Sequence, residues 1–196
     1  CTVDRVERQA DVFTAHLSNG SSIAADQVMF AIGRHPAVNG LGLEKAGVAL
    51  NPKNGGIAVN EYSQTNVPNI YAVGDVTHRI NLTPVAIREG HAFADTVFGN
   101  KPWNADHIHV PSAVFSEPEL ATVGLSEIKA REQGFELDIY RTSFRPMKAT
   151  LSGRATSMLM KLVVDAKTDR VLGVHVAGEA AAEMIQMAAI AVKMGA

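Results

Sequence analysis

The 196-residue sequence contains one cysteine, Cys1, and this scarcity excludes an internal disulfide framework and a Cys-x-x-Cys redox pair. A reducing, cytoplasmic location fits this cysteine usage. No apolar run approaches the roughly 18 residues that a membrane-spanning helix needs, and no signal-peptide pattern is visible in the first residues, which are mixed and polar. The formal net charge of −2 gives no reason to expect nucleic acid or a membrane surface as a partner.

Several familiar chemical signatures are missing as well. No Gly-x-Gly-x-x-Gly loop occurs, because the nearest match, Gly40-Leu41-Gly42, lacks the third glycine. No Walker motif and no nucleophile elbow are present. The seven histidines do not cluster at metal-ligand spacing, and the closest pair, His107 and His109, has no convincing third ligand and is interpreted as surface histidines. The sequence therefore predicts no metal site and no complete phosphate-binding loop.

The remaining composition is that of a globular protein, with 46% apolar and 19% charged residues. The length is sufficient for one or two domains with a real core. The sequence does not begin with Met, and it ends directly after a strongly helical run. We interpret these ends as those of a fragment of a longer protein; a trimmed natural domain is the alternative.

The first half of the sequence predicts strands separated by turns. Rough alternation over residues 3–17 and the dipeptide Asn19-Gly20 predict a hairpin. The continuous apolar run 28–32 predicts a buried strand. Shorter apolar runs at 57–59 and 70–74 predict two further strands, and residues 43–46 predict a helical turn.

The second half predicts an antiparallel sheet with helices. Ser126 is a good N-cap for a short helix that ends near Gly134. Residues 179–194, rich in Ala and Met, predict a longer helix. Strands are expected at 113–115, 121–123, 136–143, 157–165 and 171–177. This half of the chain is therefore predicted to be α+β.

The candidate chemistry lies around Asp75. The predicted strand 70–74 delivers this carboxylate to a tight turn, and Thr83 as N-cap with Pro84 starts a helix. The helix should run to about Phe98, with Gly99 at its C-terminal cap. A carboxylate beside a helix N-terminus suits the ribityl hydroxyls and the developing negative charge of a flavin dinucleotide. Two plainer interpretations stay open: Asp75 bonds its own turn, and Thr83-Pro84 only starts a helix.

Gly33 has a comparable ambiguity. It follows the predicted strand 28–32, and either ends it as a turn glycine or permits close approach of the backbone to a cofactor.

Several motifs together resemble the pyridine nucleotide–disulfide oxidoreductases. They are Ala31-Ile32-Gly33-Arg34-His35-Pro36, Asn69-Ile70-Tyr71-Ala72-Val73-Gly74-Asp75, Leu82-Thr83-Pro84-Val85-Ala86, Val114-Phe115-Ser116-Glu117-Pro118 and Thr122-Val123-Gly124-Leu125. The resemblance implies an α/β plus α+β fold made of the ends of two Rossmann-like nucleotide-binding domains and an interface domain. It implies that residues 1–36 end the NADPH-binding domain, 37–106 form the second part of the FAD-binding domain, and 107–196 form the interface domain of a homodimer.

The same resemblance implies the site residues. FAD would be bound by Gly74, Asp75, Leu82, Thr83 and Pro84, with Asp75 on the ribityl chain and Thr83 by the flavin ring. Gly33, Asn81 and Ala113 would lie near NADPH. No catalytic residue is expected in these residues, because the redox-active cysteine pair and the His-Pro-Thr segment of the family are not among them. The 196 residues alone are therefore expected to be inactive.

Within the family, the branch that reduces glutathione disulfide is the best match, on Leu82-Thr83-Pro84 and Ser143-Phe144-Arg145-Pro146-Met147-Lys148. One position departs from that branch: His91 stands where many members carry an Arg that contacts the substrate. A related reductase of another small disulfide, or a non-catalytic dimerisation module, is the alternative.

Overall fold

The computed structural model describes all residues, Cys1–Ala196, and the chain forms two compact units, Cys1–Ala86 and Ile87–Ala196. No helix has both the length and the apolar character needed to cross a membrane. The three-domain division expected from the resemblance stays a prediction.

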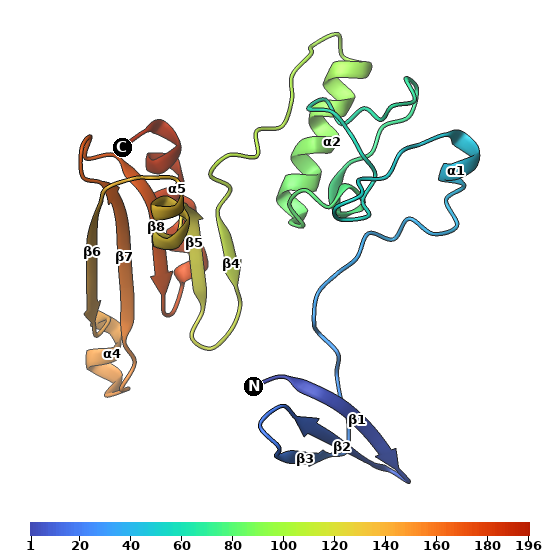
Figure 1. Cartoon of the computed structure of the whole chain (residues 1–196). Coiled ribbons are helices and arrows are strands. Elements are labelled where there is room, and N and C mark those ends of the chain that lie inside the picture. The colour runs from blue at the N-terminus through green and yellow to red at the C-terminus, as the bar shows by residue number, and fades with distance from the viewer. The chain divides into compact units, whose positions relative to one another are not determined.

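The N-terminal unit begins with a small antiparallel sheet. Its strands β1 (Val3–Gln9), β2 (Val12–Leu17) and β3 (Ser22–Ala25) lie in the order β1-β2-β3 (Figure 1). The turn between β2 and β3 confirms the hairpin signal, since Gly20 has φ of 84° and donates its N–H to the Leu17 carbonyl at 2.9 Å. The Asn19 side chain accepts the N–H of Ser21 at 3.1 Å, so both turn residues have their expected roles.

The prediction of a buried strand at 28–32 is wrong for this chain. These residues form no strand, and the exposed fractions of Met29, Phe30 and Ile32 are 86%, 70% and 92%. A continuous apolar run is typical of a strand flanked on both sides in a parallel sheet. No strand of these 196 residues pairs with the run, so its backbone has no ladder to join.

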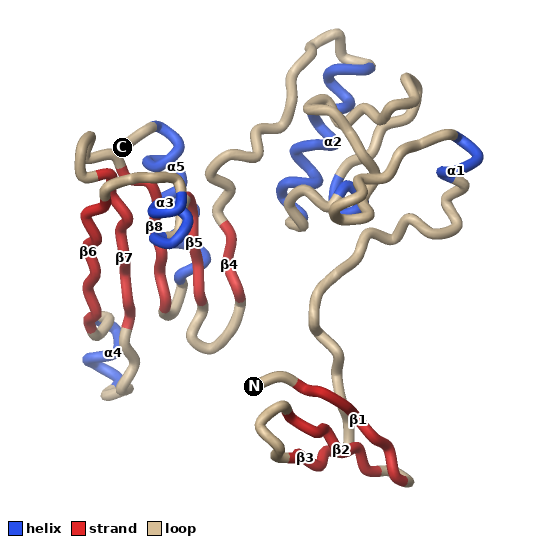
Figure 2. Tube along the Cα trace, in the orientation of Figure 1, coloured by secondary structure: helices blue, strands red, loops and turns tan.

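The rest of the N-terminal unit is mostly loop around a small core of Val48, Ile57 and Ala72 (Figure 2). The helical turn predicted at 43–46 is confirmed as α1 (Leu43–Ala46). The prediction of regular strands at 57–59 and 70–74 is wrong. Each segment contributes only one isolated bridge, Ile57 with Leu50 and Tyr71 with Gln64. Short extended segments that pair at one residue cannot build a ladder, however apolar they are.

The C-terminal unit contains a five-stranded antiparallel sheet in the order β4-β5-β8-β7-β6 (Figure 1). This confirms the α+β prediction. The strands are β4 (Ser112–Val114), β5 (Leu120–Gly124), β6 (Leu137–Phe144), β7 (Met158–Asp165) and β8 (Val171–Ala177). The helices are α3 (Glu127–Glu132), α4 (Met147–Ser152) and α5 (Ala181–Met194).

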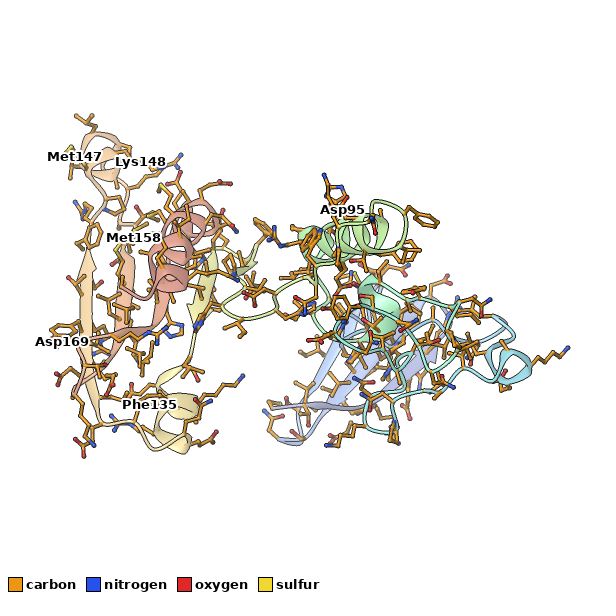
Figure 3. The ribbon with its side chains drawn as sticks, turned by 90° about the horizontal axis from the view of Figure 1, so that it is seen from above. Asp95, Phe135, Met147, Lys148, Met158 and Asp169 are labelled. Carbon is orange, nitrogen blue, oxygen red and sulfur yellow. The ribbon has the colours of Figure 1, made fainter.

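The cap of α3 is confirmed, because Ser126 Oγ accepts the N–H of Lys129 at 3.2 Å. Helix α4 was not expected from the sequence. It joins β6 to β7, and Figure 3 shows its residues Met147 and Lys148 toward one end of this unit, with Phe135 toward the other.

Strand alternation decides which residues face each helix. On one face of the sheet, Val123 and Val176 pack with the fully buried Ile185 of α5. On the other face, Val163 packs with Ala130 of α3, and both are fully buried. Because β-strand side chains point to opposite faces in turn, the same strands supply both cores.

A polar row crosses the sheet on the face of α3. Thr122, His175 and Lys161 lie directly opposite one another on β5, β8 and β7. The Nε2 of His175 lies 3.2 Å from the Leu125 carbonyl and so donates to it, and its Nδ1 accepts from Thr122 Oγ1 at 2.7 Å. Lys161 Nζ bonds Glu127 Oε2 at 2.6 Å, which lowers the pKa of that carboxyl. The row is thus built around a neutral imidazole and an ion pair.

His175 should make the stability of the chain depend on pH. Burial, opposed by its bond to the Leu125 carbonyl and reinforced by the Lys161 charge, lowers the pKa of His175 below its usual value of 6.5. As pH falls below 6.5, the unfolded chain binds a proton that the folded chain does not, so acid favours unfolding until the folded pKa is passed. We expect the unfolding free energy, measured with urea, to fall more between pH 7 and 5 in the unaltered chain than in His175→Gln.

The exposed His35 supplies the control, since His35→Gln should leave the pH slope unchanged. Equal slopes for the unaltered chain and His175→Gln would contradict the prediction.

Candidate functional site

A tight turn presents Asp75. Residues Gly74–Thr77 form a single 3₁₀ turn, η1, in which Thr77 Oγ1 donates to the Gly74 carbonyl at 2.8 Å and the His78 N–H to the Asp75 carbonyl at 3.0 Å. Gly74 adopts φ of 73°, a left-handed conformation that favours glycine. Gly74 and Thr77 are buried, while Asp75 is exposed. The turn therefore buries its backbone anchors and leaves the carboxylate free to meet a ligand.

The turn lies against the start of helix α2 (Thr83–Val97). A Cβ built on Gly74 would come within 3.0 Å of the Ala86 Cβ, in the first turn of α2, so only glycine allows this approach without displacement. The structure thus brings together the two features that the sequence singled out, the Asp75 turn and the N-terminus of the helix.

The predicted N-cap is displaced by one residue. The Leu82 carbonyl accepts the Ala86 N–H at 3.1 Å, so Leu82, and not Thr83, is at the cap position, and Thr83 and Pro84 are the first two helical residues. Leucine has no side-chain oxygen to accept the first N–H groups of α2, and Pro84 has no N–H. The partially positive N-terminus of α2 therefore has no capping oxygen from Leu82, and it adjoins the turn that carries Asp75.

The end of α2 also differs in detail from the prediction. The helix ends at Val97, and the left-handed residue that follows it is Asn100, with φ of 54°, not Gly99. Gly99 has a different role: a Cβ on it would lie 2.8 Å from the Asp95 carbonyl, so the chain needs glycine there to fold back over the helix.

The other predicted site residues lie in different surroundings. Asn81 is half-buried within the same segment, and its Nδ2 lies 3.4 Å from His78 Nδ1. Gly33 is exposed just after the run 28–32, outside any helix or strand, and a Cβ on it would meet no atom within 4 Å. Ala113 is half-buried in β4 beneath α5, and His91 is exposed on α2. Within the N-terminal unit, the chain therefore brings the turn of Gly74 and Asp75 against the start of α2, and Gly33 has none of these atoms near it.

The sequence did not indicate a buried pair formed by Glu89 of α2 and His107 of the segment that follows the helix. Glu89, with a 1% exposed side chain, lies with Oε1 2.7 Å from His107 Nε2, and the His107 side chain is only 25% exposed. His107 is thus not the surface histidine that the sequence suggested. No local pattern marks the pair, because its members are 18 residues apart.

An ion pair ties the same connecting segment, between α2 and β4, to α5. Lys193 Nζ lies 2.7 Å from Asp106 Oδ2 and donates to the Ile108 carbonyl at 3.0 Å. The hydrogen bond from Lys193, together with that from the Ile108 N–H, lowers the pKa of Asp106. Both pairs fix the path of the chain between α2 and β4. No group of three or more metal-ligating side chains converges in the structure.

Comparison with known proteins assigns the fold to a class and then to a family. Residues 1–90 match the family model described as pyridine nucleotide-disulphide oxidoreductase, and residues 110–196 match the model for the dimerisation domain of that family. This confirms the fold class: the ends of two Rossmann-like nucleotide-binding domains followed by an α+β dimerisation domain. The chain belongs to the pyridine nucleotide–disulphide oxidoreductase family.

Individual relatives are similar over nearly the whole chain. A glutathione reductase from Burkholderia cepacia is 55% identical over 96% of this chain and 42% of its own length. A trypanothione reductase from Trypanosoma congolense is 45% identical over 91% of this chain and 36% of its own length. The solved HOCl-induced flavoprotein disulfide reductase RclA from Escherichia coli has a TM-score of 0.82 and 29% identity, over 97% of this chain and 44% of its own. The chain therefore spans less than half of the length of these relatives.

Proposed function

We propose that these residues belong to an FAD- and NADPH-dependent disulfide reductase whose substrate is glutathione disulfide. The observation that carries the proposal is the exposed carboxylate of Asp75 on a turn packed against the start of α2. The 55% identity to a glutathione reductase supports the choice of substrate. A cytoplasmic location is part of the same proposal.

The residues at this site fit one part of FAD. An ionised Asp75 only accepts hydrogen bonds, so it suits the hydroxyl groups of the ribityl chain. The first N–H groups of α2 and its positive dipole end would stabilise negative charge on the flavin ring next to Thr83. When bound, FAD supplies the hydride chemistry between NADPH and the disulfide, and the protein supplies position and electrostatics.

The remaining site residues are proposed on the family resemblance alone. Gly33, Asn81 and Ala113 would lie near NADPH, and His91 near the substrate. The exposure of His91 is compatible with substrate contact. The 45% identity to a trypanothione reductase keeps another small disulfide as the alternative substrate.

We also propose that the C-terminal unit forms a homodimer. The match of residues 110–196 to a dimerisation domain supports this. Met187, Ile190 and Met194 lie at helical spacing on the outer side of α5, with exposed fractions of 67%, 64% and 82%. Exposed apolar side chains in a contiguous stripe are typical of a surface that another chain covers.

The proposal is tested with the complete open reading frame that contains these residues. The purified protein should carry FAD and oxidise NADPH when glutathione disulfide is added, followed by the nicotinamide absorbance. Trypanothione disulfide, assayed in parallel, should be a poorer substrate by kcat/KM. The 196-residue chain alone should show no turnover, since Cys1 is its one thiol.

Two outcomes would count against the proposal. A protein that binds no flavin would exclude the reductase, and if it sedimented as a dimer it would be a dimerisation module. A flavoprotein that prefers trypanothione disulfide would keep the family but change the substrate.

A further inference from the structure

Arg79 reaches back into the turn that carries Asp75. Its Nε lies 3.3 Å from Thr77 Oγ1, and its Nη2 lies 2.9 Å from Ser63 Oγ. Thr77 and Ser63 are 3% and 5% exposed, so both acceptors lie inside the N-terminal unit. Thr77 Oγ1 gives its own proton to the Gly74 carbonyl and still has lone pairs to accept from Arg79. A continuous chain of hydrogen bonds thus runs from Ser63 through Arg79 and Thr77 to Gly74.

Ser63 anchors the other end of this chain in an unusual conformation. It has φ of 62°, a backbone conformation that is strained for a non-glycine residue and persists only where the surrounding contacts impose it. Its N–H donates to the Asn60 carbonyl at 3.0 Å, and its carbonyl accepts the Ala72 N–H at 2.9 Å. Ser63 is therefore a fixed point, and the bond from Arg79 ties the η1 turn to it.

The backbone of the turn has a second, independent support. The Ile57 N–H donates to the Val76 carbonyl at 2.9 Å. A Cβ on Gly56 would lie 2.6 Å from the Thr77 carbonyl oxygen, so the Gly56 backbone packs directly on the turn. These contacts do not involve Arg79, so we expect the turn to remain folded when Arg79 is replaced and to lose only its side-chain bracing.

We infer that Arg79 is a positioning residue for Asp75: its guanidinium spans Ser63 and Thr77 and holds the η1 turn so that the Asp75 carboxylate faces FAD. This inference rests on the proposed function. Arginine suits the task because its planar fork offers several donors at fixed angles and is always charged. A lysine ammonium is a single point of charge and cannot span both hydroxyl groups in the same geometry.

The test is a double-mutant cycle in the complete flavoprotein. The dissociation constant for FAD, measured by flavin fluorescence on the apoprotein, is compared for the unaltered protein, Arg79→Met, Asp75→Asn and the double variant. Since Arg79 acts through Asp75, Arg79→Met should weaken FAD binding about 10-fold when Asp75 is present and less than about 2-fold when it is Asn. Arg79→Lys should restore only part of the loss.

A purely structural arginine gives a different pattern. It would weaken FAD binding by the same factor in both backgrounds, and that result would overturn the inference. Arg154, exposed in the loop before β7, supplies the charge control, because Arg154→Met should not change the dissociation constant. If Arg79→Met does not fold, the cycle is repeated with Ser63→Ala, which removes only the acceptor of Nη2 and should show the same coupling at about 2- to 3-fold.

The cycle also distinguishes failure of the proposed FAD site from failure of the role of Arg79. An unchanged dissociation constant for FAD in Asp75→Asn alone would overturn both the proposed FAD site and the role of Arg79. A clear change with Asp75→Asn but additive effects of the two substitutions would overturn only the role of Arg79.

Discussion

Replacing Gly173 with alanine is expected to unfold the C-terminal unit. A Cβ at this position would lie 2.0 Å from the Leu125 carbonyl oxygen and 3.0 Å from its carbonyl carbon, and both are backbone atoms. The chain crosses here from β5 toward α3, and the Leu125 N–H donates to the Leu172 carbonyl at 2.8 Å. The backbone cannot move away from a new methyl group without breaking this bond and the adjoining β5–β8 pairing. We expect a loss of more than about 3 kcal/mol, within the range seen for severe core changes.

The opposite residue of the same pair imposes the same constraint. Gly124 is in register with Gly173, and a Cβ on it would lie 2.2 Å from the Leu172 carbonyl oxygen at φ of 78°. Gly124→Ala should therefore also unfold the unit. The close crossing depends on both glycines, which explains why the adjacent strands β5 and β8 each carry a glycine at this point.

The measurement is urea unfolding of the 196-residue chain, followed by far-ultraviolet circular dichroism. Gly90 in the middle of α2 is the matched control, because a Cβ there would meet no atom within 4 Å. Gly90→Ala should stabilise the helix by about 0.5–1 kcal/mol through helix propensity alone. A loss of less than about 1 kcal/mol for Gly173→Ala would show that the close crossing is not as the structure has it.

Replacing Asp75 with alanine is expected to weaken FAD binding by the complete protein about 10- to 100-fold. Hydrogen bonds to a charged acceptor contribute about 1.5–3 kcal/mol each, and the exposed carboxylate is free to accept from the ribityl chain. The substitution should not disturb the turn, because the backbone carbonyl of Asp75, and not its side chain, accepts the His78 N–H. The expected loss is therefore one of ligand contact and not of folding.

The dissociation constant is measured by fluorescence titration of the apoprotein with FAD, beside the melting temperature of the apoprotein. Asp11, fully exposed at the turn between β1 and β2, provides the charge control, and Asp11→Ala should bind FAD as the unaltered protein does. Unchanged FAD affinity in Asp75→Ala, at an unchanged melting temperature, would remove the observation on which the proposed function depends.

The parts of the fold that the sequence predicted well are those with local signals. The hairpin at Asn19-Gly20, the cap at Ser126 and the strands and helix of the second half were all placed correctly. Where the partner strand follows after a short turn, as for β2–β3 and β7–β8, alternation and turn chemistry specify both the strands and their pairing. The pairing of β5 with β8 joins segments that are distant in sequence, and no local signal specifies it. The candidate site shares this advantage, since Asp75 and the start of α2 are close in sequence.

The sequence by itself determined the antiparallel sheet, the main helices, the site residues to examine and the resemblance to the family. Only the tertiary structure decided that the run 28–32 has no partner strand, that Leu82 and not Thr83 is at the cap position of α2, and that His107 pairs with Glu89. It also brought Arg79 to Ser63, 16 residues away. The physical reason is range: turns, caps and alternation act between neighbours in sequence, whereas a strand's partners and a buried polar group's acceptor are set by how distant segments pack.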